Sequence, residues 1–214
     1  MDAPVVAIHG HGLLPGLLAI ELLNRDRTVP VLLLSRDQAI GGEHLEPVVV
    51  SRLSAAAQTL VDPFVVASWP GYYLVREGVH DLQQDPVLLL DPVQLWLELQ
   101  TRLNLAALLA QCGKISLAGS VLSWAGGTAE IDRLIDLEPL LGLGTESEIV
   151  GIAAARSLTL PVLADYDMAS ERWSAHQYLP LGDERLVIRK MPRSNDLIGQ
   201  QSTFETLLNA LIAA

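Results

Sequence analysis

The chain has 214 residues, of which 50% are apolar and 18% are charged, a composition that excludes an intrinsically disordered protein. Its 25 acidic residues outnumber its 14 basic ones, and the net charge of −11 argues against nucleic-acid binding, which needs a positive face. The mean hydropathy of +0.33 is high for a soluble protein, yet no apolar stretch reaches the ~20 residues that span a bilayer. We therefore expect some apolar surface to face a homo-oligomer interface or a membrane, and the negative charge favours the oligomer.

The N-terminal part of the chain predicts a strand, a helix and a second strand. Residues 4–8 are a short apolar run that ends at the turn His9-Gly10-His11-Gly12, a pattern typical of a buried parallel strand. Residues 13–23 have helical length, and Pro15 falls in the first turn, where proline is tolerated. Residues 29–34 predict a second strand that is buried on both faces. Together these segments predict a right-handed βαβ unit.

The later elements follow from shorter signals. Asp91 and Pro92 predict the capped start of a helix, which we expect to end near Gly113. The other expected elements, in chain order, are a short helix at 52–60, extended segments at 64–69 and 72–75, the helix at 92–110, strands at 114–124 and 134–136, a segment at 148–160 that fits either a strand or a helix, a hairpin over 173–188 and a terminal helix at 204–212.

The turn after the first strand carries glycines where a dinucleotide pyrophosphate would lie. Gly10 allows the turn, Gly12 lets the backbone approach the phosphates, and the following helix N-terminus supplies amide donors and a positive dipole end. The third glycine of the usual fingerprint would fall at Pro15. We expect Gly16 to take over its role, which is close packing of the helix on the strand.

The end of the second strand lacks the acidic residue that accepts hydrogen bonds from the ribose in such folds. Ser35 stands there and is followed by Arg36 and Asp37. Serine bonds one hydroxyl without a charge, and Arg36 is either a ligand for a 2′-phosphate or an ordinary surface cation. The sequence therefore predicts the fold but leaves open whether FAD, NAD(P) or neither is bound.

We predict an α/β fold with a Rossmann-like, FAD/NAD(P)-binding βαβ core and an inserted, partly antiparallel β region. Residues 1–214 are expected to form a single dinucleotide-binding-like domain. The inserted region is expected at 60–130, and a further hairpin at 173–190. The single cysteine, Cys112, and an N-terminus without a positive region indicate a cytoplasmic protein, with membrane association left open.

Several motifs resemble the bacterial lycopene β-cyclases, which bind a flavin. In that family Gly-Gly-Gly-Leu-Ala-Asn-Gly stands where this chain has residues 10–16, so the shifted position of Gly16 is shared. The family's Gly-Gly-Asn-His and Trp-Pro-Asp-Tyr resemble residues 41–44 and 69–72, and its Leu-Pro-Leu hairpin and Arg-Leu-Leu-Ile strand resemble 178–181 and 185–188. We therefore expect the cofactor to be bound by Gly10, Gly12, Gly16, Ser35, Arg36, Gly41 and Gly42.

The departures from this family bear on function. The acidic ribose ligand is replaced by Ser35, and the family's Asp-Gly-Arg-Gly turn corresponds to residues 136–139, Asp-Leu-Glu-Pro. The Glu-Asp pair implicated in acid catalysis corresponds to Arg189 and Lys190. Cyclisation protonates a polyene to a carbocation, which two fixed cations oppose. The chain is also shorter than such cyclases, so we assign no catalytic residue.

Two hypotheses for function follow. The first is a shortened lycopene-cyclase-like flavin-fold protein of carotenoid metabolism, with impaired or altered cyclase chemistry and an apolar polyene or other small molecule as its ligand. The second is a non-catalytic Rossmann-fold protein that binds an apolar ligand or a protein partner.

We predict no metal site, because His9 and His11, even with His44, do not form a patterned ligand set.

Overall fold

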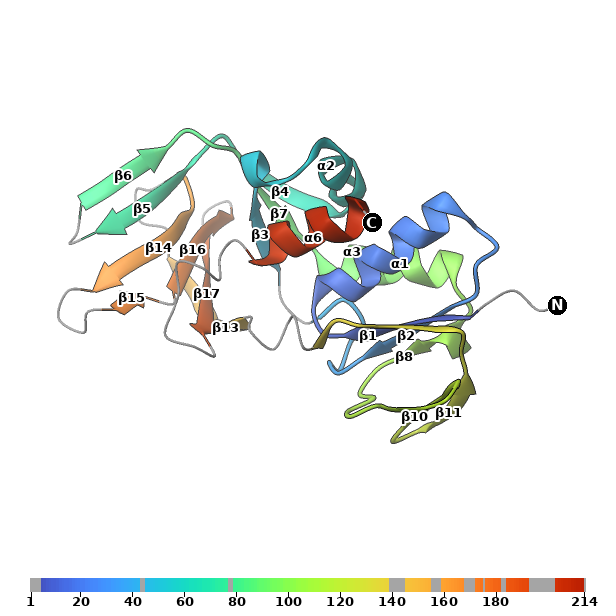
Figure 1. Cartoon of the computed structure of the whole chain (residues 1–214). Helices are drawn as coiled ribbons and strands as arrows, with labels where there is room; N and C mark the ends of the chain where they lie inside the picture. The colour runs from blue at the N-terminus through green and yellow to red at the C-terminus, as the bar shows by residue number, and fades with distance from the viewer. Residues whose placement is uncertain are drawn as a thin grey trace.

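The computed structural model describes residues 5–42, 45–76, 79–138, 145–154, 159–167, 172–174, 176–181, 184–192 and 203–213. These residues form a parallel sheet, two three-stranded sheets and a larger mixed sheet (Figure 1). Helices cover one face of the parallel sheet and a small antiparallel sheet covers the other, so the N-terminal part of the molecule has three layers.

The parallel sheet has the order β12-β1-β2-β8, with strands β1 (Val6–Gly10), β2 (Val31–Ser35), β8 (Leu108–Leu109) and β12 (Arg133–Asp136). Every side chain of β2 is buried, which explains why its sequence is continuously apolar rather than alternating. The parallel pairing of β1 with β2 across the intervening helix confirms the predicted βαβ unit and the Rossmann-like core.

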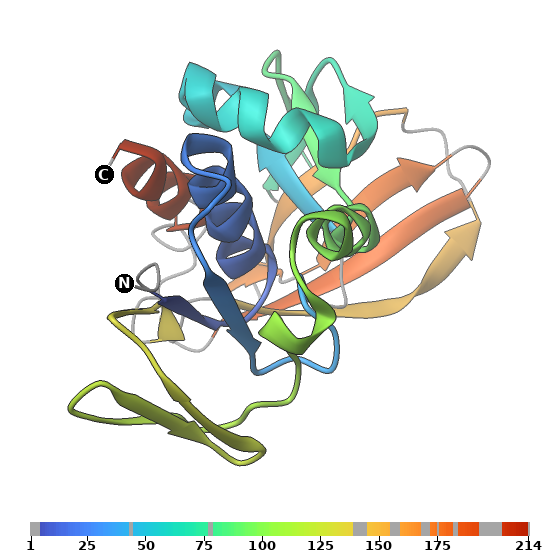
Figure 2. The same ribbon diagram turned by 90° about the vertical axis from the view of Figure 1, so that its right-hand side faces the viewer.

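The helices pack on one face of this sheet. Their bounds are α1 (Leu13–Arg25), α2 (Ala55–Val61), α3 (Pro92–Arg102) and α6 (Thr203–Ala213), with 3-10 turns η1 (Val50–Arg52), η2 (Asp62–Phe64) and η3 (Leu105–Ala107). Ile8 and Leu33 point to this face and join a core with Leu17 of α1 and Leu208 of α6. The C-terminal helix lies beside α1, as Figure 2 shows.

The opposite face of the parallel sheet is covered by β9 (Ser116–Ala118), β10 (Val121–Trp124) and β11 (Gly127–Glu130), which pair in sequence as antiparallel neighbours. Ala7 and Leu34 point to this face, where they pack with Leu122 and Cys112. The alternation of Ala7, Ile8 and Leu33, Leu34 between the two faces is the period of two that any strand imposes.

The rest of the chain builds two sheets. The three-stranded sheet β3-β7-β4 contains β3 (Glu46–Val49), β7 (Val87–Leu90) and β4 (Val65–Trp69). The larger sheet has the order β13-β17-β16-β14-β5-β6 with β15 paired to β14, and its strands are β5 (Tyr72–Arg76), β6 (Val79–Gln83), β13 (Thr145–Ala154), β14 (Val162–Asp167), β15 (Arg172–Ser174), β16 (His176–Leu181) and β17 (Glu184–Pro192). Val49, Tyr72 and Leu179 are buried between the two sheets.

Three predicted elements differ from the structure. The helix at 92–110 ends at Arg102, because Asn104 begins a 3-10 turn and Leu108–Leu109 pair with β2 as a parallel edge strand. The expected strand at 114–124 is two strands that are separated by a turn at Gly119, whose φ is +64°. These differences arise because strand pairing outweighs the helical and alternating patterns of the local sequence.

The third difference concerns the hairpin over 173–188. Its second arm is confirmed, because β16 and β17 pair antiparallel from His176 to Arg189. Trp173 lies in β15 and pairs with Tyr166 of β14, so the hairpin starts at His176 instead.

None of the helices in the described ranges combines the length and the apolarity that a bilayer crossing requires. The homo-oligomer and the membrane contact stay predictions.

Candidate functional site

The turn between β1 and α1 has an open, left-handed backbone at its second glycine. Gly12 is the residue that precedes α1, and its φ is +69°, a conformation that favours glycine. A Cβ atom added to Gly12 would meet nothing within 4 Å. The first turn of α1 has no acidic side chain. The turn therefore presents backbone and the positive end of a helix dipole to open space.

Gly16 has a different role from the one that the sequence predicts. A Cβ atom there would lie 2.8 Å from Leu95 Cδ2 and 3.1 Å from Leu99 Cδ1. Both leucines are fully buried residues of α3. Gly16 therefore allows the close approach of α1 to α3, whereas we expected it to allow packing of the helix on the strand.

The loop after β2 lies against the glycine turn. Gly41 and Gly42 have φ values of +93° and +87°. A Cβ atom on Gly42 would lie 3.1 Å from Gly12 Cα, and one on Gly41 would lie 3.2 Å from the Pro92 carbonyl oxygen. The structure thus brings Gly42 together with Gly12, as a shared site requires, and the absence of side chains makes this contact feasible.

An acidic side chain, Asp37, lies two residues after the end of β2. Ser35 is only 2% exposed, and its hydroxyl oxygen accepts a 3.1 Å hydrogen bond from the backbone N–H of Asp37. The Asp37 carboxylate oxygen Oδ2 in turn accepts a 2.7 Å hydrogen bond from the N–H of Gly12. Asp37 is therefore a site residue that counting along the strand did not find, although its place directly after Arg36 was a signal.

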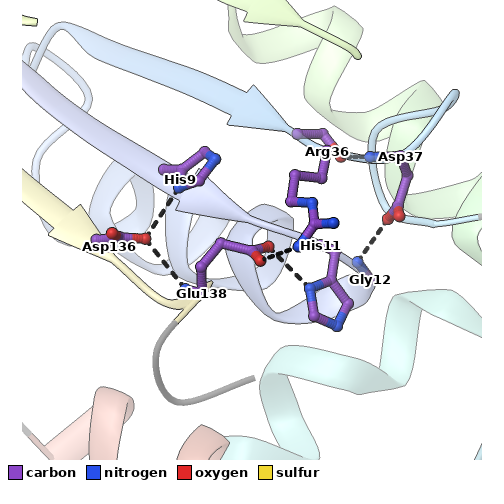
Figure 3. Close-up of polar contacts among 8 residues, drawn as sticks. His9, His11, Gly12, Arg36, Asp37, Asp136 and Glu138 are labelled. Carbon is purple, nitrogen blue, oxygen red and sulfur yellow. Dashed lines mark hydrogen bonds and ion pairs between the residues drawn. The ribbon is translucent and has the colours of Figure 1, made fainter. Parts of the chain in front are cut away.

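Two histidine–carboxylate pairs bridge the ends of β1 and β12 (Figure 3). Nδ1 of His9 lies 2.9 Å from Oδ1 of Asp136, and Nδ1 of His11 lies 2.8 Å from Oε1 of Glu138. The register of the parallel strands places His9 opposite Asp136. His9 and His11 are two residues apart, and so are Asp136 and Glu138. The second pair therefore forms next to the first, past the ends of the two strands.

Glu138 also binds the arginine that follows β2. Nη1 of Arg36 donates a 2.8 Å hydrogen bond to Oε2 of Glu138, so this carboxylate connects β2, β1 and β12. Burial by itself would raise the pKa of Glu138, but the hydrogen bonds and charges of Arg36 and His11 together hold it below its ordinary value. Glu138 is therefore ionised at neutral pH, and Arg36 is engaged by it.

His9 and Cys112 are the buried reactive groups near this edge. His9 is 3% exposed, and its Nε2 has no hydrogen-bond partner among the described residues. Burial raises the pKa of the Cys112 thiol, although a backbone hydrogen bond at Ser35 acts in the opposite direction, so the thiol is not activated. Within the ranges that the structure describes, no three side chains of the metal-binding type come together. His44 lies outside those ranges.

No protein-family model and no curated protein matches the sequence. Solved structures do match. The tetrameric form of 2-methyl-3-hydroxypyridine-5-carboxylic acid oxygenase has a TM-score of 0.56 at 10% identity, over 100% of this chain and 68% of that one. HpxO of Klebsiella pneumoniae, complexed with FAD and uric acid, has a TM-score of 0.51 at 12% identity, over 100% and 66%. The peptidyl tryptophan dihydroxylase QhpG has a TM-score of 0.53 at 16% identity, over 91% and 47%.

These similarities concern the fold. The chain spans about half to two thirds of the length of these solved structures. Their low sequence identity leaves the activity of this chain to be argued from its own residues. The parallel sheet, the glycine turn and the second sheet together give this chain a Rossmann-like α/β fold, which it shares with these solved structures.

Proposed function

We propose that this chain binds a dinucleotide, with FAD as the favoured cofactor, at the carboxyl edge of the parallel sheet. The observation that carries the proposal is the Gly12 turn, which combines a left-handed backbone, open space and an N–H that holds an anionic oxygen of Asp37. A pyrophosphate needs the same donors and the same helix dipole. The FAD in the structure of HpxO supports the choice of cofactor.

The residues at this edge fit the backbone requirements of the cofactor. Gly10 and Gly12 would face the pyrophosphate, and Gly42 packs close enough to Gly12 to close the turn from the other side. Arg36 is bonded to Glu138, which argues against its use as a ligand for a 2′-phosphate and hence against NADP(H). Bound FAD would supply hydride or electron transfer, and this chain would hold and orient it.

The substrate part of the proposal rests on the resemblance to lycopene β-cyclases. We place the chain in carotenoid metabolism, as a diverged relative that handles an apolar polyene with altered chemistry. The residues that replace the family's Glu-Asp pair lie within β17, where Arg189 is in register with Glu148 of β13 and with His176 of β16. A guanidinium does not donate the proton that cyclisation needs, so we expect no cyclisation of lycopene.

A second candidate function is a non-catalytic protein that keeps this fold and binds an apolar ligand or a protein partner. One observation favours it. Asp37 engages Gly12, and Glu138 engages Arg36 and His11, so the charges at the sheet edge are balanced by the chain itself. Retention of FAD separates the two candidates.

The first experiment measures how much FAD the purified protein retains after incubation and desalting. We expect about one FAD per chain and loss of retention in Gly12→Val, because the added side chain fills the space in front of the turn. Gly119→Val is the matched control, since Gly119 has a φ of +64° and equally open surroundings but lies in the β9–β10 turn. Both variants therefore place a β-branched side chain at a positive φ.

Failure of the wild-type protein to retain any dinucleotide would overturn the cofactor proposal. Equal retention by wild type and Gly12→Val would mean that the cofactor binds elsewhere.

The substrate part of the proposal has a separate test, which is expression in a bacterial host that accumulates lycopene. We expect no cyclised product, and its appearance would refute the inference from Arg189 and Lys190.

A further inference from the structure

Two carboxylates of the chain occupy the edge at which the cofactor phosphates would bind. Oδ2 of Asp37 lies 2.7 Å from the Gly12 nitrogen, and the Glu138 carboxylate lies between His11 and Arg36. We infer that Asp37 is a tethered competitor of the dinucleotide, which must leave the Gly12 N–H before a phosphate takes its place. This inference rests on the function proposed above and concerns the regulation of that same site.

The position of Asp37 is fixed by its backbone rather than by its carboxylate. Its N–H donates to Oγ of Ser35, at 3.1 Å, and its carbonyl oxygen accepts a hydrogen bond from the N–H of Gln111, at 3.0 Å. The carboxylate is therefore presented to the glycine turn without a large loss of chain entropy. A tethered group of this kind has a high effective concentration at its target.

The Gly12 N–H makes one strong hydrogen bond at a time. A phosphate oxygen and the Asp37 carboxylate need the same donor, and they repel each other because both are negative. Gly42 lies close to both groups, because a Cβ atom built on it would lie 3.1 Å from Gly12 Cα and 3.7 Å from Oδ2 of Asp37. Phosphate binding therefore requires the Asp37 side chain to rotate away.

Glu138 also opposes phosphate binding, through its contacts with Arg36 and His11. It binds Arg36 and His11, the two basic side chains next to the turn, and its own side chain is only 15% exposed. While these contacts persist, the positive charge of Arg36 that would attract phosphates is neutralised by Glu138. Asp37 occupies the Gly12 N–H directly, whereas Glu138 weakens the attraction of the sheet edge for phosphate.

The test compares FAD affinity among three variants with matched loss of one negative charge. Asp37→Asn keeps the shape and can still accept a hydrogen bond, but the bond is weaker because the amide is neutral, so we expect FAD to bind about tenfold more tightly. Glu138→Gln should give a smaller gain of about threefold. Asp81→Asn is the control, since Asp81 is exposed on β6, far from the parallel sheet, and should leave the affinity unchanged (Figure 1).

Affinity is measured by quenching of FAD fluorescence at fixed ionic strength, after thermal unfolding has shown that each variant is folded. The amide resonance of Gly12, followed by NMR, gives an independent readout: it should shift in Asp37→Asn without FAD, and FAD should shift it in every variant. Should Asp37→Asn fail to fold, Glu138→Gln and the Gly12 resonance of the wild type carry the test.

The outcomes separate this inference from the function on which it rests. Tighter FAD binding by Asp37→Asn, with Asp81→Asn unchanged, supports the tethered competitor. Equal or weaker binding by Asp37→Asn, while the wild type binds FAD, overturns the inference alone, because Asp37 would then assist the cofactor. Absence of binding in all variants overturns the proposed function, and the inference falls with it.

Discussion

The segments that follow β1 and β12 lie side by side on one sheet edge but are built in different ways. The turn after β1 is a backbone structure, in which Gly12 leaves open space and an N–H at the start of α1. The segment after β12 is a side-chain structure, in which Asp136 and Glu138 are bonded to His9 and His11. The turn keeps open space in front of Gly12 but has the Asp37 carboxylate on its N–H, whereas the side chains after β12 are paired with one another and with the two histidines.

This difference explains how one edge can have the shape of a cofactor site and yet be balanced in charge without a cofactor. The shape depends on glycines, which leave the backbone open to an anionic ligand, and the balance depends on charged and polar side chains that meet only in the folded protein. Separate substitutions can disturb the glycine turn and the charged side chains.

A side chain at Gly16 should disturb the packing of α1 against α3, which positions the glycine turn. We expect Gly16→Val to lower the free energy of unfolding by about 2–3 kcal/mol, because its side chain would overlap Leu95 and Leu99 of α3. Urea unfolding measures this loss. Gln100→Val, at an exposed position of α3, is the control and should cost about 0.5 kcal/mol from helix propensity alone. Equal losses would show that α1 and α3 adjust freely to a larger residue.

Removing Asp136 tests the pair that it forms with the buried histidine, His9. We expect Asp136→Ala to cost about 2 kcal/mol, because buried His9 and the N–H of Glu138 both lose their hydrogen-bond acceptor. Asp132→Ala is the control. It removes one exposed hydrogen bond to the N–H of Val5 and should cost less than half as much. A loss no larger than that of the control would mean that His9 finds another partner.

The pH dependence of stability tests Glu138. Its pKa in the folded protein lies below the usual 4.5, so its contacts stabilise the fold above about that pH and are lost as the pH falls through the lowered pKa. We expect Glu138→Gln to cost about 1 kcal/mol at pH 7 and to weaken the loss of stability as the pH falls below about 4.5. Urea midpoints across this range measure both effects.

Glu98→Gln is the matched control for this prediction. It breaks a pair with Arg102 on the exposed surface of α3, which should be worth less than 0.5 kcal/mol. An equal change in the two variants at pH 7 would mean that the cluster at the sheet edge behaves as an ordinary surface pair. A pH profile of Glu138→Gln that matches the wild type would assign the acid sensitivity to other carboxylates.

The sequence predicts the elements that depend on local patterns. The strand before Gly10, the helix from Leu13 and the strand that ends at Ser35 are present because apolar runs and glycine turns act within a few residues. The prediction is wrong where pairing with a distant segment decides. Leu108–Leu109 form a strand only because the edge of β2 is there to pair with them.

The candidate site divides in the same way. The glycine turn is readable from the sequence, because glycine permits the positive φ that Gly12 adopts. The contacts of Asp37 with the Gly12 N–H, and of His9 and His11 with carboxylates 127 residues away, form only in the folded sheet. The pairing of β1 with β2 brings Asp37 to the turn and the register of β1 with β12 selects the partners of the histidines, and register depends on the packing of the whole sheet rather than on any local pattern.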